Sequence, residues 1–236
     1  MAQAGIHALV GFQVARVIPP KKFLGCWIII GALLPDLDLI IVALASILQP
    51  IEEATQLYHR SFSHNFFIII FLYLICALVS EIINHSRFKV MGKGLSLGML
   101  THLILDTLFW FTPIYLLWPL PLKPFNFWSF MSIPEYGKHI IMIIEFLFFY
   151  IYAAFLIQMH LTKPHIHTIS FPLLIRWKKI EIILFLLFVA LLFFNVPGFK
   201  VLFSVAYIPS LIFAIFATWQ SRHCLDQSLF ITQKVS

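Results

Sequence analysis

Long apolar runs constrain this chain more than any other feature of its sequence. Of its 236 residues, 61% are hydrophobic and only 11% are charged, whereas soluble domains carry about 25% charged residues. Six runs are each close to the ~20 residues that a membrane-spanning helix requires. We therefore predict an all-α, polytopic transmembrane bundle of about six spans. The predicted spans are 23–48, 65–84, 95–118, 139–160, 179–195 and 199–219.

A shorter apolar stretch precedes these spans. Residues 2–18 carry no charge before Arg16 and are followed by Pro19. They predict a short N-terminal helix that either inserts into the membrane or lies on its surface. No polar region is long enough to form a separate soluble domain, so we expect a single membrane domain over 1–236. Its polar motifs fall within 1–125, and 126–236 is expected to be mainly helical scaffold.

The basic residues predict an orientation. Six spans place twelve of the 16 lysines and arginines on one side and four on the other. Cytoplasmic loops carry an excess of such residues, so we expect the larger group and the C-terminus to be cytoplasmic. The charges are spread between apolar runs, so the net charge of +6 does not predict a nucleic-acid partner. The larger group is Arg16, Lys21, Lys22, Arg87, Lys89, Lys93, Lys163, Arg176, Lys178, Lys179, Arg222 and Lys234; the smaller is Arg60, Lys123, Lys138 and Lys200.

Acidic and histidine residues interrupt two of the apolar runs. An Asp at the centre of a membrane helix costs roughly 2.5–3.5 kcal/mol, so such residues usually mark a function. In LLPDLDLI, Pro35 should break the first span and place Asp36 and Asp38 in the first turn of a new half-helix. The alternative is a proline kink whose freed amides the carboxylates cap. In THLILDTL, His102 and Asp106 share one helix face and form either half of a divalent-metal site or a buried hydrogen bond.

Three more histidines fit the same depth in the membrane. The stretch LYHRSFSHN places His59 and His64 just before the second span, on the outer side, and His7 lies in the N-terminal helix. At about 1.5 Å per residue, His7, Asp36 and Asp106 lie roughly 18–20 Å from the cytoplasmic ends of their helices. Segments distant in sequence therefore bring polar groups to the middle or outer half of a core about 30 Å thick.

This set of residues predicts a metal site. Nitrogen and carboxylate ligands without a thiolate suit zinc, manganese or iron(II). Seven candidates exceed the four ligands of a tetrahedral ion, so we expect one or two ions, with zinc favoured. Such a site makes hydroxide available near neutral pH. The predicted metal ligands are His7, Asp36, Asp38, His59, His64, His102 and Asp106.

Neighbouring residues are candidates for supporting roles. Arg60 either pairs with an anionic substrate oxygen or lies at the headgroup level. Ser61 and Ser63 are placed to donate hydrogen bonds to ligands. Glu145, inside the fourth span, either supports the site or stays protonated. The candidate catalytic acids are Asp36, Asp38 and Asp106.

The order of these motifs resembles the YdjM-like family of inner-membrane proteins, which is assigned to metal-dependent hydrolysis. The resemblance covers about residues 1–125 and rests on His7, LPDLD, HRSFSH, GMLTHLILD and LLWPL. It implies a metal-dependent hydrolase and the same seven residues as motif positions. Asn65 stands where serine commonly follows the second histidine, and the expected glycine before the WP element is missing, so substrate preference can differ.

The depth of the site suggests its substrate. A pocket in the outer half of the bilayer predicts a lipid or lipid-linked ester or phosphoester, hydrolysed by metal-activated water. The alternative is a divalent metal-ion transporter, because HxxxD on membrane helices is similar to the sites of such proteins. A transporter needs polar groups that continue to the cytoplasmic face, and FLGCWIIIGALL and GLSLGML contain no acid or histidine. We therefore favour a hydrolase.

Overall fold

The computed structural model describes residues 4–19, 21–109, 111, 113–131, 133–162 and 170–226. The regular structure of these residues is helical, apart from one isolated bridge between Ile114 and Phe125, so the predicted all-α class is confirmed. The helices are α1 (Ala4–Val17), α2 (Leu24–Leu33), the 3-10 turn η1 (Leu34–Leu37), α3 (Asp38–Ala45), α4 (Ile51–Tyr58), α5 (Phe66–Ile82), α6 (Arg87–Phe109), α7 (Glu135–Leu161), α8 (Ser170–Phe193) and α9 (Phe199–Gln220).

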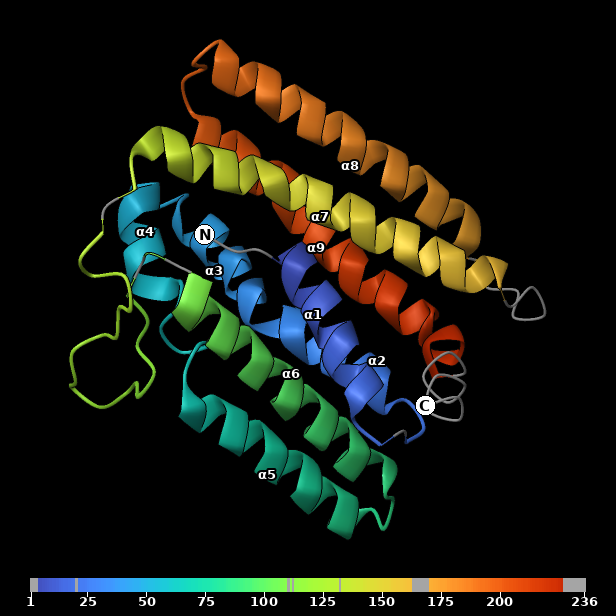
Figure 1. The fold of residues 1–236 in the computed structure, drawn as a ribbon. Coiled ribbons are helices and arrows are strands. Elements are labelled where there is room, and N and C mark those ends of the chain that lie inside the picture. Colours follow the sequence, from blue (N-terminus) through green and yellow to red (C-terminus); the bar gives the residue numbers. More distant parts are fainter. Residues whose placement is uncertain are drawn as a thin grey trace.

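The longer helices form a bundle with one main direction. Figure 1 shows α5, α6, α2, α9, α7 and α8 lying along this direction, and successive helices of the chain run up and down it. One end carries α4 and the connection from α6 to α7, and we refer to it as the α4 end. The loops that were predicted to be cytoplasmic gather at the opposite end, although residues 163–169 and 227–236 lie outside the described part of the chain.

Within the described part of the chain, three helical segments are long and apolar enough to cross a membrane, judged by length and composition. They are Leu24–Ala45, Glu135–Leu161 and Phe199–Gln220, and α1 and α5 are shorter apolar helices. The helices α6 and α8 each carry three basic residues in their first ten positions, which reduces their hydropathy. An integral membrane bundle is therefore supported, whereas the count of six spans remains a prediction.

Several predicted boundaries differ from the observed ones. The third predicted span ends early, because α6 stops at Phe109 and the described residues after it, 111 and 113–118, are not helical. Pro113 in this stretch supplies no backbone donor. The fifth span was predicted from 179, but α8 begins at Ser170. Arg176 and Lys178, which were expected to precede the span, therefore lie within the helix. The short helix α4 was not predicted, since its sequence IEEATQLY is too polar to read as part of a span.

The first span changes its helical form at the predicted position. The α-helix α2 ends at Leu33, η1 follows with Pro35 in its first turn, and α3 begins at Asp38. Proline fixes its own backbone angle and lacks an amide hydrogen, so a tighter 3-10 turn replaces the regular pattern there. The break places Asp36 and Asp38 in successive short turns, where both side chains are buried.

Two glycines let α2 and α6 approach closely. A methyl group on Gly98 would collide with the carbonyl oxygen of Ile28, and one on Gly31 would collide with the backbone of Leu95. Without side chains at these positions the two backbones come into contact. One turn beyond Gly98, His102 therefore reaches the end of α2.

The N-terminal helix packs inside the bundle. It contacts α2, α6, α7 and α9 and lies among them in Figure 1. The first amides of a helix have no partner within it, and here side chains of other helices supply two. The N–H of Ala4 donates to the Tyr207 hydroxyl (3.3 Å), and the N–H of Gly5 donates to Glu145 Oε1 (2.5 Å). Of the two predicted placements for this helix, insertion is the one that the packing supports.

Candidate metal centre

The seven predicted ligands lie in one cluster near the α4 end of the bundle. Each is buried, with at most 6% of its surface exposed. Five separate segments supply them, since α1, η1, α3, the loop between α4 and α5, and α6 all contribute. A set of charged and imidazole groups this deep must be satisfied by mutual contacts or by a bound ion. Its members are His7 (α1), Asp36 (η1), Asp38 (α3), His59 and His64 (the loop), and His102 and Asp106 (α6).

The hydrogen bond of His102 to α2 fixes its tautomer. Its Nδ1 lies 2.8 Å from the carbonyl oxygen of Ala32, which can only accept, so Nδ1 carries the proton. Its Nε2 therefore presents a lone pair to the cluster. This nitrogen lies 3.8 Å from Asp36 Oδ1 and 3.7 Å from Asp106 Oδ2.

His64 presents a second lone pair to the same point. Ser63 Oγ donates to Asp38 Oδ2 (2.6 Å) and lies 2.8 Å from His64 Nδ1. The hydroxyl has one proton, so His64 Nδ1 is the donor in the second contact, and Nε2 is left unprotonated in the neutral ring. The two Nε2 atoms of His64 and His102 lie 3.0 Å apart. Two facing lone pairs repel each other unless a cation lies between them.

The separations in this group fit a metal ion. Zinc bonds of about 2.0–2.1 Å to nitrogen and oxygen place tetrahedral ligand atoms about 3.3 Å apart. The two facing nitrogens and Asp36 Oδ1 are separated by 3.0, 3.8 and 3.9 Å. Asp36 Oδ1 has no hydrogen-bond partner among the described residues. Asp36, His64 and His102 thus offer three converging ligand atoms.

A second three-residue group overlaps with the first. His7 Nε2 lies 3.1 Å from Asp106 Oδ1, and the rings of His7 and His102 stack at 3.8 Å. Together these three residues also bring ligand atoms within reach of one ion. His102 belongs to both groups but has a single unprotonated nitrogen. The geometry therefore favours one ion near this nitrogen over two complete sites.

Asp38 lies one layer behind these ligands. Its Oδ1 accepts from His59 Nδ1 (2.8 Å), and its Oδ2 accepts from Ser63 and from the N–H of Arg60 (3.1 Å) and lies 3.3 Å from His64 Nδ1. A carboxylate on the second ring nitrogen orients an imidazole and raises its basicity. Burial lowers the pKa of His59 to about 4, so its ring is neutral. Asp38 and His59 therefore have different surroundings from the five residues that face the centre.

The loop that contains both histidines bends at Arg60. This residue has a left-handed backbone (φ 64°), which is uncommon for a side chain of its size. Asn65 then caps α5 by accepting from the N–H of Ile68 (2.9 Å). The LLWPL segment holds the other side of the loop, because Leu116 accepts from the N–H of Phe66 (3.0 Å). This bend lets two histidines five residues apart approach the same carboxylate.

Arg60 and the two serines of the loop have distinct places. Arg60 Nη2 lies 2.8 Å from Asp106 Oδ2, and the residue is 3% exposed, so it is buried against the cluster and is not a surface side chain. Ser63 contacts Asp38 and His64, as a supporting donor would. Ser61 instead donates to the carbonyls of Leu57 (3.2 Å) and Tyr58 (3.3 Å) at the end of α4 and does not reach the ligands.

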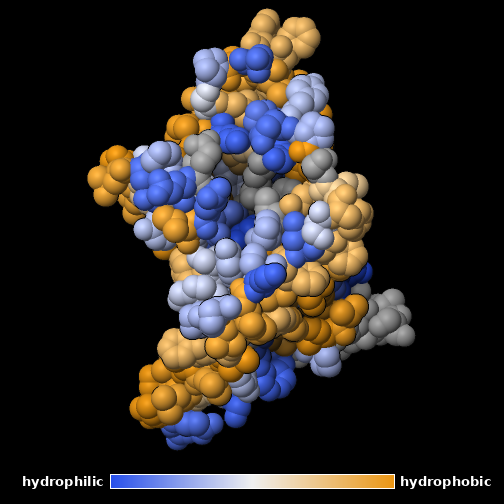
Figure 2. Space-filling model, turned by 90° about the vertical axis from the view of Figure 1, so that its left-hand side faces the viewer, coloured by the Kyte–Doolittle hydropathy of each residue, from blue (hydrophilic) through white to orange (hydrophobic). Residues whose placement is uncertain are grey.

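A polar hollow leads towards the cluster from the α4 end. Its volume is about 400 Å³, and His59, Arg60 and Tyr115 are part of its wall, together with Thr55 and Gln56 of α4. We call it the mouth. Figure 2 shows hydrophilic side chains gathered around a hollow on this end of the molecule, with hydrophobic side chains over the lower part, where α5 and α6 lie.

Two residues of the second half of the chain support the site. Tyr207 of α9 donates to Asp36 Oδ2 (3.4 Å) and accepts from Ala4, so it joins an expected ligand to the start of α1. It was missed because a tyrosine within an apolar run gives no sign of its partner. Glu145 was predicted to support the site, and it lies at the start of α1, bonded to Gly5 and not to a ligand. It therefore acts on His7 through the position of the helix.

Comparisons with known proteins give one match. The family model described as YdjM inner membrane protein matches residues 1–221. No curated protein and no solved structure matches the chain. The matched range extends well beyond the motifs of the first 125 residues and includes α7, α8 and α9, and therefore both Glu145 and Tyr207.

Proposed function

We propose, from the premise that the chain belongs to the YdjM inner membrane protein family, that it is a membrane-embedded hydrolase that uses one divalent ion. The observation that carries the proposal is the approach of Nε2 of His64 to Nε2 of His102, 3.0 Å apart beside Asp36. With both rings neutral, the contacts of their Nδ1 atoms with Ser63 and Ala32 make both Nε2 atoms acceptors, and a cation bound between them accounts for their approach. Zinc is the ion that this donor set suits best.

The proposed ligands are the five residues that face the common centre. Asp36 offers an oxygen without a hydrogen bond, whereas both oxygens of Asp38 are occupied, so we assign Asp36 to the ion and Asp38 to orienting His59 and His64. Asp106 bridges the centre to Arg60. The five proposed ligands are His7, Asp36, His64, His102 and Asp106.

The remaining chemistry follows from the groups at the mouth. A bound divalent ion would supply a Lewis acid and make hydroxide available near neutral pH. Arg60 places a cation between the cluster and the mouth, where it can hold an anionic oxygen of a substrate. Asp38 holds Nδ1 of His59 and so orients this ring in the wall of the mouth, where we propose that it exchanges a proton with the substrate. A phosphoester or ester with a negative charge suits these groups.

A lipid or lipid-linked molecule is the proposed substrate class. The mouth opens on a protein whose outer faces are apolar, with exposed residues such as Phe67, Ile70 and Leu74 on α5. A substrate that reaches it from the bilayer brings its head group to the polar groups of the mouth. Membrane association itself is supported by the family and by the apolar helices.

An activity assay with a matched histidine control tests the proposal. Purified protein loaded with zinc would be incubated with bacterial phospholipids and lipid phosphates, and the products identified by mass spectrometry. We expect a chelator or His102→Ala to lower hydrolysis at least ~100-fold. A residue that only orients a metal ligand is worth about 10–100-fold, and here the ion or one of its proposed ligands is removed. His160→Ala is the control, since His160 is also buried with Nδ1 3.0 Å from a backbone carbonyl but lies at the far end of α7. Equal activity of the two variants would contradict the proposal.

A divalent-ion transporter is the second candidate, and one observation favours it. Buried polar pairs continue away from the cluster between α7, α8 and α9. Ser210 donates to Glu181 (2.6 Å), and the hydroxyls of Tyr152 and Thr218 lie 2.6 Å apart. Towards the predicted cytoplasmic side, α2 and α6 contain no acid or histidine, but α7, α8 and α9 do carry buried polar groups beyond the cluster. Zinc uptake into proteoliposomes without any hydrolysis would favour this candidate.

A further inference from the structure

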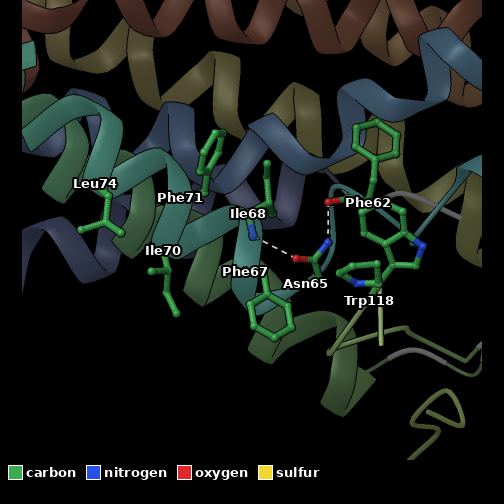
Figure 3. A pocket seen from close by; sticks show the side chains of 9 residues that line it. Phe62, Asn65, Phe67, Ile68, Ile70, Phe71, Leu74 and Trp118 are labelled. Carbon is green, nitrogen blue, oxygen red and sulfur yellow. Dashed lines mark hydrogen bonds between the residues drawn. The ribbon is translucent and has the colours of Figure 1, made fainter. Parts of the chain in front are cut away.

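An apolar groove runs along α5 beside the loop of the two histidines. Its volume is about 700 Å³, within the range of small-molecule sites. Figure 3 shows Leu74, Ile70 and Phe67 following one another along the helix, with Asn65 and Trp118 at one end. We propose that this groove binds an acyl chain of the lipid whose head group occupies the mouth.

The lining of the groove suits a hydrocarbon chain. Asn65 is its one strongly polar side chain, and its amide is already used, since it accepts from the N–H of Ile68 and donates to the carbonyls of Ser61 and Phe62. The remaining wall consists of aromatic and branched aliphatic side chains and a proline. Among the described residues of the wall, a polar ligand would find few hydrogen-bonding partners besides the indole N–H of Trp118. From Phe67 to Leu74 the groove follows α5 for roughly 10 Å.

The groove connects with the mouth through shared residues. A smaller hollow of about 260 Å³ lies between them. Trp118 is part of the wall of both this hollow and the groove, and Tyr115 is part of the wall of both this hollow and the mouth. A molecule with a polar head and an apolar tail can therefore lie across all three, with the head beside Arg60 and the tail against α5.

The charges along this path favour an anionic head group. Arg60 is part of the wall of the mouth, and Lys123 lies at the smaller hollow. Both belong to the smaller group of four basic residues, which is predicted to lie on the outer side of the membrane. The polarity thus changes in one direction, from Arg60 at the mouth and Lys123 at the smaller hollow to hydrocarbon at Leu74. This order matches an anionic lipid better than a second protein copy, which would need its own charged groups at one end of a short apolar strip.

A pair of matched tryptophan substitutions tests the groove. Full-length protein in detergent, stripped of lipid, would be titrated with dioleoyl phosphatidylglycerol, and bound lipid counted by native mass spectrometry. We expect Leu74→Trp to weaken binding at least about tenfold, the equivalent of losing roughly two buried methylene groups. Leu78→Trp is the control, because it lies one turn further on the same helix, is equally exposed (60% against 56%) and does not line the groove. Its affinity should match that of the unmodified protein.

Further measurements separate this inference from the proposed function. Placing the head group in the mouth rests on the proposed function, whereas acyl-chain binding in the groove does not. His102→Ala should lose hydrolysis but keep lipid binding. Unmodified, zinc-loaded protein that binds the lipid without hydrolysing it would refute the enzyme and leave the groove intact. Glycerol 3-phosphate, which has no acyl chain, should compete equally well in Leu74→Trp and unmodified protein. Equal lipid affinity of the two tryptophan variants would overturn the groove, as would a change in oligomeric state with unchanged lipid binding. Ile70→Trp fills the same groove and takes the place of Leu74→Trp should that variant not fold.

Discussion

The hydrogen bond from His102 to Ala32 decides what the cluster can bind. By holding the proton on Nδ1, the carbonyl of Ala32 turns Nε2 into an acceptor. Ser63 and Asp38 do the same for His64. Both lone pairs then face one point beside Asp36. A change in either orienting contact should therefore act on metal affinity more than on the fold.

The two serines of the loop give a test at this scale. Ser63→Ala removes the hydroxyl between Asp38 and His64, so we expect zinc affinity to fall roughly 10–100-fold. The free energy of unfolding should fall by only about 1 kcal/mol, the net value of one hydrogen bond. Ser61→Ala is the control, because the Ser61 hydroxyl donates to carbonyls of α4 and does not reach the ligands. Competition with a zinc-binding dye measures both variants, and equal affinities would contradict the role of Ser63.

The sequence predicted which residues gather here but not their separate roles. Spacing and depth pointed to His7, Asp36 and Asp106, since ionisable groups in apolar runs are costly and few. The layer behind them was not predictable, because Asp38 differs from Asp36 only through contacts that the loop makes. Tyr207 was missed for a related reason, since its hydroxyl gains importance only from the position of α1.

At the scale of helices, α1 depends on contacts from the second half of the chain. Its buried start would leave amides unsatisfied without Tyr207 and Glu145. A carboxylate near a helix start also interacts favourably with the helix dipole. His7 lies within the first turn of this helix, so the placement of α1 places His7.

Two tyrosines distinguish this positioning from general stability. Tyr207→Phe should lower zinc affinity about tenfold, because Asp36 loses a contact and Ala4 loses an acceptor. Tyr152→Phe removes a buried hydroxyl that contacts Thr218 instead. Both variants should lower the melting temperature, since each loses about 1 kcal/mol of hydrogen bonding. Only Tyr207→Phe should change zinc affinity, and an equal change in both would refute the positioning role.

Close packing of α2 on α6 gives a second test among helices. Gly98→Ala forces the two backbones apart, and such overpacking costs about 1–3 kcal/mol. It should also weaken zinc binding, because His102 follows one turn later. Gly137→Ala on α7 meets the Cγ2 methyl of Ile133, a residue of the preceding loop, and no backbone, so it should cost clearly less than Gly98→Ala and leave zinc binding unchanged. Thermal unfolding in detergent and a zinc titration would be measured for both, and equal behaviour would contradict the account.

Helix existence was easier to predict than helix ends. Apolar runs gave α5, α7 and α9 to within a few residues, because hydrophobic length is set by the bilayer. Pro35 correctly marked the break before α3. The ends of α6 and α8 were wrong because basic and aromatic residues near an interface continue or end a helix through tertiary contacts that hydropathy does not report.

At the scale of the whole molecule, orientation is the main untested prediction. Ser129 belongs to the connection from α6 to α7, which lies at the α4 end, and Ser86 belongs to the connection from α5 to α6, which lies at the opposite end. Both residues are exposed, so each can be replaced by a cysteine that reagents reach. The three native cysteines are buried and should contribute little background. A membrane-impermeant maleimide applied to intact spheroplasts should label Ser129→Cys and reach Ser86→Cys only after permeabilisation. The reverse pattern would invert the predicted topology.

The central claim is that the buried cluster of histidines and aspartates holds a divalent ion. Crystals of the zinc-loaded protein, measured at the zinc absorption edge, test it most directly. We predict an anomalous peak about 2.0–2.2 Å from Nε2 of His64, Nε2 of His102 and Oδ1 of Asp36. The claim would be contradicted by the absence of a peak in the cluster while these two nitrogens still lie about 3.0 Å apart.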